Sequence, residues 1–213
     1  MQALSSSLAT LCHLAELNLR DNELGDESAV FLAEAVIAGM TSLTLLDARY
    51  NRVAHVGATA LGEALGKAAG GLRVLRLSSN EMGAGGTSAL ARSLLACSKL
   101  EKIGLSSNMI DDSAASALAL MLQRQQNLRS LNISRNLLEL DGACVIAEAL
   151  GGLMRLEKLS IRENRWGDEG RCFFDQVLSW NFALRLEDGD GPERAASWHA
   201  DEETEGLAAL VFR

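Results

Sequence analysis

The chain has 213 residues, of which 48% are hydrophobic, and its formal net charge is −8 at pH 7. A chain of this length can bury one core of ordinary size, and its apolar runs fall well short of the roughly 20 residues that a membrane helix needs. The acidic balance disfavours nucleic acid as a partner. The four cysteines and three histidines show neither metal-ligand nor catalytic spacing. We therefore expect no catalytic residues, no metal, no cofactor, no small-molecule substrate and no membrane association.

Residues 1–13 are similar to the helical part of a repeat that recurs later in the chain. Residues 3–14, with the sequence ALSSSLATLCHL, align with residues 89–100, with the sequence ALARSLLACSKL. The stretch is therefore either the remnant of an earlier repeat in a longer array or an amino-terminal cap helix. No basic region precedes its apolar residues and serines interrupt them, so we expect no signal peptide.

From Leu14 onwards, one phrase recurs six times and ends each time in an asparagine. Its first copy reads Leu14-x-x-Leu17-x-Leu19-x-x-Asn22. The six asparagines follow one another at intervals of 29, 29, 28, 28 and 28 residues and are Asn22, Asn51, Asn80, Asn108, Asn136 and Asn164. A fixed period of this kind is typical of units that stack into a solenoid. Because an amide side chain can bond backbone groups at a turn, we expect the asparagines to form a ladder along the array.

The second half of each repeat predicts a helix. Apolar residues recur ten and fourteen positions after the asparagine, as Leu61 and Leu65 do after Asn51, and residues four apart share one helical face. The alternating leucines of the phrase share one face of a strand, which can pack on that helix. The strands of successive repeats must then pair in parallel. The sequence thus predicts an α/β solenoid with an inner parallel β-sheet, outer α-helices and six full repeats of 28–29 residues.

This pattern resembles the leucine-rich repeats, and its long, helix-bearing period resembles their ribonuclease-inhibitor-like subfamily. The resemblance covers residues 3–184. The subfamily includes the ribonuclease inhibitor, the sensor arrays of NOD-like receptors, the Ran GTPase-activating protein, the tropomodulin carboxy-terminal domain and several ciliary proteins. One departure is that the ribonuclease inhibitor alternates asparagine with cysteine at the corner, whereas this chain has asparagine at all six corners.

The repeat pattern stops at residue 187, where a glutamate stands in place of the expected strand leucine. We interpret residues 166–184, which begin with Trp166, as an aromatic carboxy-terminal cap that closes the core, with an aromatic ligand site as the alternative. The predicted array then spans residues 1–184. Residues 185–213 hold eight acidic residues and three arginines, and we predict an acidic, mobile tail.

The cysteines have no spacing that favours disulfides, because neighbouring helices lie about 8–10 Å apart and a disulfide needs Cα atoms within roughly 7 Å. We expect all of them to be small buried side chains in a reducing compartment. This predicts a cytoplasmic protein, and an association with the cytoskeleton or a cilium stays open. The four residues are Cys12, Cys97, Cys144 and Cys172.

The strand residues between the leucines point away from the helices, into the concavity of the array. We call these positions, which lie six, four, two and one residues before each asparagine, the concave face. They hold seven basic and four acidic residues, a net charge of +3 on a chain of net charge −8. This contrast favours an acidic protein surface or peptide as the partner, and the aromatic Tyr50 is the best candidate for a hot spot. The predicted partner-binding residues are Arg20, Asp47, Arg49, Tyr50, Arg76, Lys102, Arg135, Lys158 and Arg162.

These features favour a non-enzymatic scaffold for protein–protein interaction that forms part of a larger protein or assembly. The outer helices and the ends of the array are alternative binding surfaces. The resemblance leaves three other functions open: a regulator of a small GTPase similar to the Ran GTPase-activating protein, a cytoskeletal or ciliary structural component, and the sensor end of a NOD-like receptor. A further hypothesis is that the acidic tail folds over the basic concave face and competes with the partner.

Overall fold

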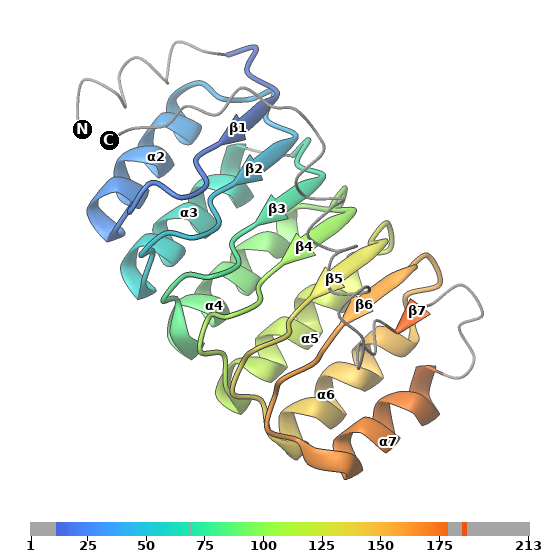
Figure 1. Cartoon of the computed structure of the whole chain (residues 1–213). Helices are drawn as coiled ribbons and strands as arrows, with labels where there is room; N and C mark the ends of the chain where they lie inside the picture. Colours follow the sequence, from blue (N-terminus) through green and yellow to red (C-terminus); the bar gives the residue numbers. More distant parts are fainter. Residues whose placement is uncertain (1–11, 69, 179–184, 187–213) are drawn as a thin grey trace.

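The computed structural model describes residues 12–68, 70–178 and 185–186, which form one array of strands and helices (Figure 1). Most of the predicted amino-terminal partial repeat or cap lies outside the described residues. The same is true of residues 179–184 of the predicted aromatic cap and of the predicted tail from residue 187 onwards.

Seven strands form a single parallel sheet in which each strand pairs with the next along the chain. Consecutive strands are aligned at offsets of 29, 29, 28, 28, 28 and 27 residues, from Glu16 opposite Leu45 to Lys158 opposite Arg185. The parallel sheet predicted from the repeat period is therefore confirmed. The strands are β1 (Glu16–Asn18), β2 (Leu45–Asp47), β3 (Val74–Arg76), β4 (Lys102–Gly104), β5 (Ser130–Asn132), β6 (Lys158–Ser160) and β7 (Arg185–Leu186).

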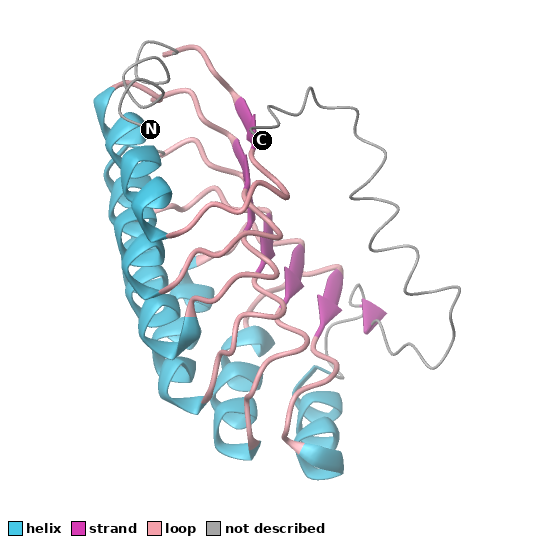
Figure 2. Cartoon of the chain, turned by 60° about the vertical axis from the view of Figure 1, so that its left-hand side comes forward, coloured by secondary structure: helices cyan, strands magenta, loops and turns pink. Residues whose placement is uncertain are grey.

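One helix follows each of the first six strands, and the helices line up as a layer on one side of the sheet (Figure 2). This arrangement is the solenoid predicted from the alternation of strand and helix patterns. Two short 3-10 turns, η1 (Leu94–Ala96) and η2 (Asp112–Ala114), adjoin the helices of the third and fourth repeats. The helices are α2 (Asp26–Ala38), α3 (His55–Ala68), α4 (Gly83–Ser93), α5 (Ala115–Arg124), α6 (Leu140–Gly151) and α7 (Gly167–Leu178).

The core lies between the two layers and is built from the repeated apolar positions. The strand leucine Leu46 and the helix leucines Leu61 and Leu65 are all at most 1% exposed, and burying each such side chain contributes about 1.5–3 kcal/mol. The helices approach one another closely where the repeat has a small residue. A Cβ atom on Gly62 would lie 2.9 Å from the Cα of Leu90 in the next helix, so this position admits no larger side chain without a shift of α3 from α4.

The corner asparagines join each repeat to the one before it. The Nδ2 of Asn51 donates to the carbonyl of Leu19 at 2.9 Å, and its Oδ1 accepts from the N–H of Leu24 at 2.8 Å. The same amide also donates to Ala48 in its own turn, at 3.1 Å. Equivalent bonds recur at Asn80, Asn136 and Asn164. The predicted asparagine ladder is confirmed from Asn51 onwards, since these asparagines satisfy backbone groups that the preceding repeat leaves without strand or helix partners.

The asparagine of the fourth repeat departs from this pattern. The Nδ2 of Asn108 donates to the Leu77 carbonyl at 2.9 Å, as the ladder requires. Its Oδ1 is buried and has no hydrogen-bond partner. The donor contact of the ladder is therefore kept at Asn108, but the acceptor contact is missing.

The backbone turns away from each strand at the residue before the asparagine. All six of these residues have φ between 53° and 59°, in the left-handed region that costs an L-residue roughly 1–2 kcal/mol. None of them is β-branched, in keeping with the steric cost of a branched Cβ at positive φ. The turn directs the asparagine side chain inward. The hydrogen bonds that the asparagine then makes offset the cost of the left-handed backbone conformation. The residues are Asp21, Tyr50, Ser79, Ser107, Arg135 and Glu163.

The carboxy-terminal end of the sheet differs from the prediction. The repeat period predicts that the array ends at residue 184 because Glu187 replaces a leucine, but β7 extends the sheet to Leu186. Leu186 pairs with Leu159, so the last interval is 27 residues and the strand leucine comes one residue early. Within the predicted cap, Trp166 packs on Phe174 with ring centroids 5.1 Å apart, while the closure of the core by this region stays a prediction.

We predict that Asn136→Ala lowers the free energy of unfolding by about 3 kcal/mol, because it leaves buried backbone groups of two repeats without partners. Asn136 donates to the carbonyls of Leu105 and Ile133, and accepts from the N–H of Ile110. Urea unfolding followed by circular dichroism measures the loss. The matched control is Asn127→Ala, whose side chain makes exposed hydrogen bonds only and should cost less than about 1 kcal/mol. Equal losses in the two variants would contradict a structural role for the ladder.

Candidate protein-binding face

The register of the sheet brings the predicted partner-binding residues into neighbouring columns. Asp47, Arg76 and Gly104 lie side by side on β2, β3 and β4, as do Leu45, Val74 and Lys102. Side chains two residues apart on a strand share one face, so these columns lie on the side of the sheet opposite the core leucines. The structure therefore assembles the concave face as the repeat phrase predicts.

Two of the predicted basic residues form an ion-pair network with Asp47. Arg49 binds Asp47 through its Nη2 at 2.6 Å and its Nε at 2.9 Å, and Arg76 approaches the same carboxylate through its Nη1 at 3.5 Å. All three side chains are at most 7% exposed. A two-point guanidinium contact with a carboxylate is among the stronger charged hydrogen bonds. Arg49 and Arg76 thus neutralise a buried carboxylate within the face, and their charge is not displayed at its surface.

The amino-terminal edge of the face carries an exposed aromatic contact. The guanidinium carbon of Arg20 lies 4.9 Å from the centroid of the Tyr50 ring. Tyr50 is 40% exposed, so the pair presents both a ring and a positive charge to solvent. Such a contact stabilises an exposed site by about 0.5–1 kcal/mol and holds the ring in place. The role of Tyr50 as a hot spot stays a prediction.

The positive charge that remains exposed lies mainly over β4 to β6 and the turns after β5 and β6. Lys102 is exposed, while Lys158 and Arg162 are half-buried. Arg135 is exposed and pairs with Glu163 at 3.0 Å across two repeats, an ion pair that solvent weakens. The face is therefore not uniformly basic, because Arg49 and Arg76 are buried against Asp47 while Lys102 and Arg135 are exposed.

A second column of charges runs beside the face and was missed by the repeat analysis of inward positions. One residue after the first leucine of the phrase, arginine and glutamate alternate: Arg73, Glu101, Arg129 and Glu157. Arg73 pairs with Glu101 at 2.9 Å, and Arg129 pairs with Glu157. The alternating signs in successive repeats would have revealed this column. Because the charges of this column pair with one another, the column is electrically neutral. It runs along the amino-terminal ends of the strands.

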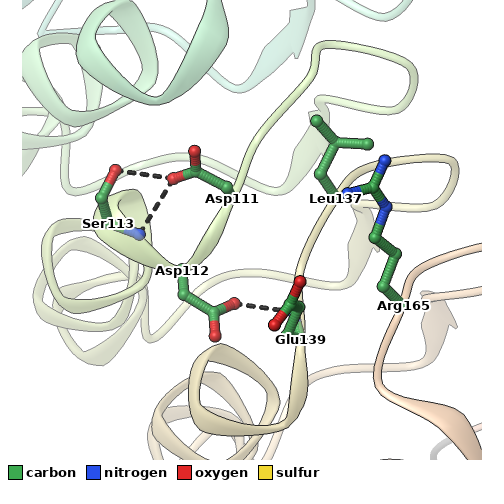
Figure 3. Close-up of a pocket in the computed structure, with 6 residues that line it drawn as sticks. All are labelled: Asp111, Asp112, Ser113, Leu137, Glu139 and Arg165. Atoms are coloured by element: carbon green, nitrogen blue, oxygen red, sulfur yellow. Dashed lines mark hydrogen bonds between the residues drawn. The ribbon is translucent and has the colours of Figure 1, made fainter.

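A shallow pocket of about 360 Å³ lies where the helices of the fourth and fifth repeats begin (Figure 3). Its carboxylates cap backbone groups. Asp111 accepts from the N–H and the hydroxyl of Ser113, and Asp112 accepts from the N–H of Glu139 at 2.7 Å. Within the described part of the chain, no group of three or more His, Cys, Asp or Glu side chains is placed to hold a metal ion. Both aspartates of the pocket thus have hydrogen bonds that support the local backbone.

The cysteines are free, but the expectation that all four are buried was wrong. Only Cys97 is buried, and its thiol lies 3.6 Å from the carbonyl of Leu65. Burial raises the pKa of the Cys97 thiol to about 11. Cys12 and Cys172 are exposed, and Cys144 is half-buried. Cys144 and Cys172 lie eight residues after their asparagines, about 200° around the helix from the buried position two residues later, so they face outward.

Comparisons with known proteins agree with this architecture. A family profile described as a leucine-rich repeat matches residues 10–33, 72–91 and 96–119. The chain is similar to the solved structure of the actin-binding site 2 of leiomodin-1, with a TM-score of 0.51 and 15% identity over 93% of both chains. It is also similar to an internalin from Listeria monocytogenes, with a TM-score of 0.55 and 20% identity over 86% of this chain and 50% of the internalin. No curated protein shows significant sequence similarity to the chain.

These similarities concern the fold, and together with the sheet and helix layers they make the chain an α/β leucine-rich-repeat solenoid. This chain spans only half the length of the internalin. Across the described ranges, every helix is too short or too polar to cross a lipid bilayer.

We predict that Asp47→Asn lowers the free energy of unfolding by about 3 kcal/mol, because it removes the carboxylate charge that two buried guanidinium groups share. The substitution keeps the shape of the side chain but turns one acceptor oxygen into an NH2 donor, so the loss reports both the charge and the hydrogen bonds of that oxygen. Thermal and urea unfolding would both report it. The control is Glu163→Gln, which removes an exposed partner of Arg135 and should cost less than about 1 kcal/mol. A loss at Asp47 no larger than at Glu163 would contradict the network.

Proposed function

We propose that this chain is a non-enzymatic protein-binding module whose concave face binds an acidic protein surface or peptide. The observation that carries the proposal is the positive charge over β4 to β6, where Lys102 is exposed and Lys158 and Arg162 are half-buried, on a chain of net charge −8. A basic face on an acidic molecule orients an acidic partner and raises its association rate. Repulsion from the rest of the surface disfavours other approaches by the same partner.

The solenoid supports this proposal because it offers a rigid, extended surface of aligned columns. The short side chains of Ser78, Gly104 and Ser106 at the centre of the face allow a partner backbone to come close. The proposal includes an intracellular, reducing location, since the exposed Cys12 and Cys172 are free thiols. It also includes membership of the ribonuclease-inhibitor-like subfamily, which the helix in each repeat and the long period favour.

Charge reversal at two lysines of the face tests the proposal. We expect Lys102→Glu with Lys158→Glu to lose one specific protein that the wild-type chain captures from a cell lysate, with at least a tenfold weaker Kd once that protein is purified, from two lost ion contacts. The affinity of the wild type should fall as salt rises. The control, Lys67→Glu with Arg92→Glu, makes the same change in net charge on the helix layer. The proposal is wrong if the concave variant and the wild type capture the same proteins.

A cytoskeletal role is the second candidate function. It is favoured by the similarity in fold to a segment described as an actin-binding site of leiomodin-1, which covers nearly the whole of both chains. We expect, for this candidate, that the chain co-sediments with actin filaments and that the concave variant does so less than its control. Recovery of the chain in the supernatant at all actin concentrations would contradict the cytoskeletal role. The proposal of an acidic partner would not be affected.

A further inference from the structure

Two lysines of the concave face lie in one column of the sheet, two strands apart. The register places Lys102 of β4 and Lys158 of β6 on either side of Ser130 of β5. The next residue of each strand belongs to the buried core, so the three side chains lie on the opposite, concave side. Lys102 is exposed and Lys158 is half-buried. Because neighbouring strands are about 4.8 Å apart, the Cα atoms of the two lysines lie roughly 10 Å from each other.

The carboxylates that adjoin the two lysines are paired with arginines. Each lysine directly follows a glutamate of the neutral column that runs beside the face. Glu101 pairs with Arg73 at 2.9 Å, and Glu157 pairs with Arg129. From the third to the sixth repeat, this column and the lysine column together hold four basic and two acidic residues, a net charge of +2. The arginines thus offset the glutamates, and the net positive charge of the two columns comes from the lysines.

The face over β4 to β6 holds no carboxylate at the positions six, four and two residues before each asparagine. Apart from the two lysines, these positions hold four serines, one glycine, one asparagine and Arg162. The acidic residue of the face in these repeats is Glu163, which pairs with Arg135 at 3.0 Å. An anion above Ser130 can therefore meet two ammonium groups, and the serine between the lysines adds neither a carboxylate nor a bulky side chain.

A phosphate group matches two converging ammonium groups better than a carboxylate does. A phosphorylated side chain carries a charge of about −1.5 to −2 at pH 7 and three acceptor oxygens. A glutamate carries a single charge and two acceptor oxygens, so two lysines above one glutamate leave an excess of positive charge. Two carboxylates brought to the same place repel each other, whereas one phosphate places a similar charge on a single group. Basic clusters recognise phosphorylated segments of partner proteins in this way.

We propose that Lys102 and Lys158 together bind one phosphorylated side chain of the acidic partner, a phosphoserine or a phosphothreonine, above Ser130. Each ammonium group donates to a different oxygen of the phosphate, and the two positive charges balance its two negative charges. The lysines act as a pair, because the sheet holds them in one column on alternate strands. This inference rests on the proposed function and names the chemical group that the concave face recognises.

The test titrates the full chain at low salt with acetylated, amidated peptides in which phosphoserine, glutamate or serine stands between glycines. With the phosphopeptide, we expect saturable NMR shifts at the amides of Lys102, Ser130 and Lys158. The glutamate peptide should bind at least about fivefold more weakly, since it balances only one lysine. Lys102→Gln and Lys158→Gln should each weaken binding of the phosphopeptide about fivefold, the upper range for an exposed ion pair. The inference is overturned if the phosphopeptide binds no tighter than the glutamate peptide, or if neither substitution weakens it.

Matched controls separate the lysine pair from general effects. Lys67→Gln removes one positive charge from α3, where Lys67 lies beside Glu63, and it should bind the phosphopeptide as the wild type does. Inorganic phosphate and vesicles of phosphatidylcholine with phosphatidic acid present a phosphate group without a peptide. Binding of either one more tightly than the phosphopeptide would overturn the assignment to a protein partner. Thermal unfolding of every variant verifies that the fold is retained.

Phosphatase treatment of the purified partner separates this inference from the proposed function. We expect the treatment to weaken the affinity of the partner for the wild-type chain about as much as charge reversal at Lys102 and Lys158 does. If charge reversal abolishes binding while the treated partner binds as before, the phosphate assignment is wrong and the proposed function stands. If charge reversal leaves binding unchanged, the proposed function fails, and the inference fails with it.

Discussion

The structure depends on a contact between successive repeats: from Asn51 onwards, the amide of the corner asparagine bonds the backbone of the turn before it. A turn that leaves a strand through a left-handed residue exposes carbonyl and N–H groups to the core, where no water can satisfy them. An asparagine amide carries both a donor and an acceptor, so one side chain can satisfy both kinds of group. Asn51 does this for the carbonyl of Leu19 and the N–H of Leu24. Because the contact works at a single register, it also sets how the strands align.

The fixed register determines the chemistry of the concave face. Residues at the same place in successive repeats become neighbours, so Asp47 of the second repeat meets Arg76 of the third as well as Arg49 of its own. The same alignment places Gly104 between two long side chains and next to the Ser78 hydroxyl. The face therefore has a paired, buried region over β2 and β3, a centre without carboxylates, and basic side chains that are exposed or half-buried over β4 to β6.

Much of the fold follows from the sequence because the same pattern of leucines and asparagine recurs six times. The period predicts the parallel sheet, the helix layer, the asparagine ladder and the columns of the concave face. The period alone does not predict where a unit departs from it. Leu186 pairs with Leu159 after 27 residues instead of 28. No local sequence pattern shows that the segment between these two strands is one residue shorter. Counting the charged residues of the face also does not predict that Arg49 and Arg76 pair with Asp47. The count gives a net charge but does not show which charges are buried against one another.

The asparagine contacts all point in one direction along the chain. In the first, second, fourth and fifth repeats, an N–H of the turn donates to the asparagine of the following repeat, 26 or 27 residues later. The last turn has no such successor at the expected distance, where Gly191 and Pro192 stand. During synthesis from the amino terminus, a repeat therefore remains incompletely bonded until the next one has left the ribosome. We therefore expect the nascent array to become ordered one repeat behind its growing end.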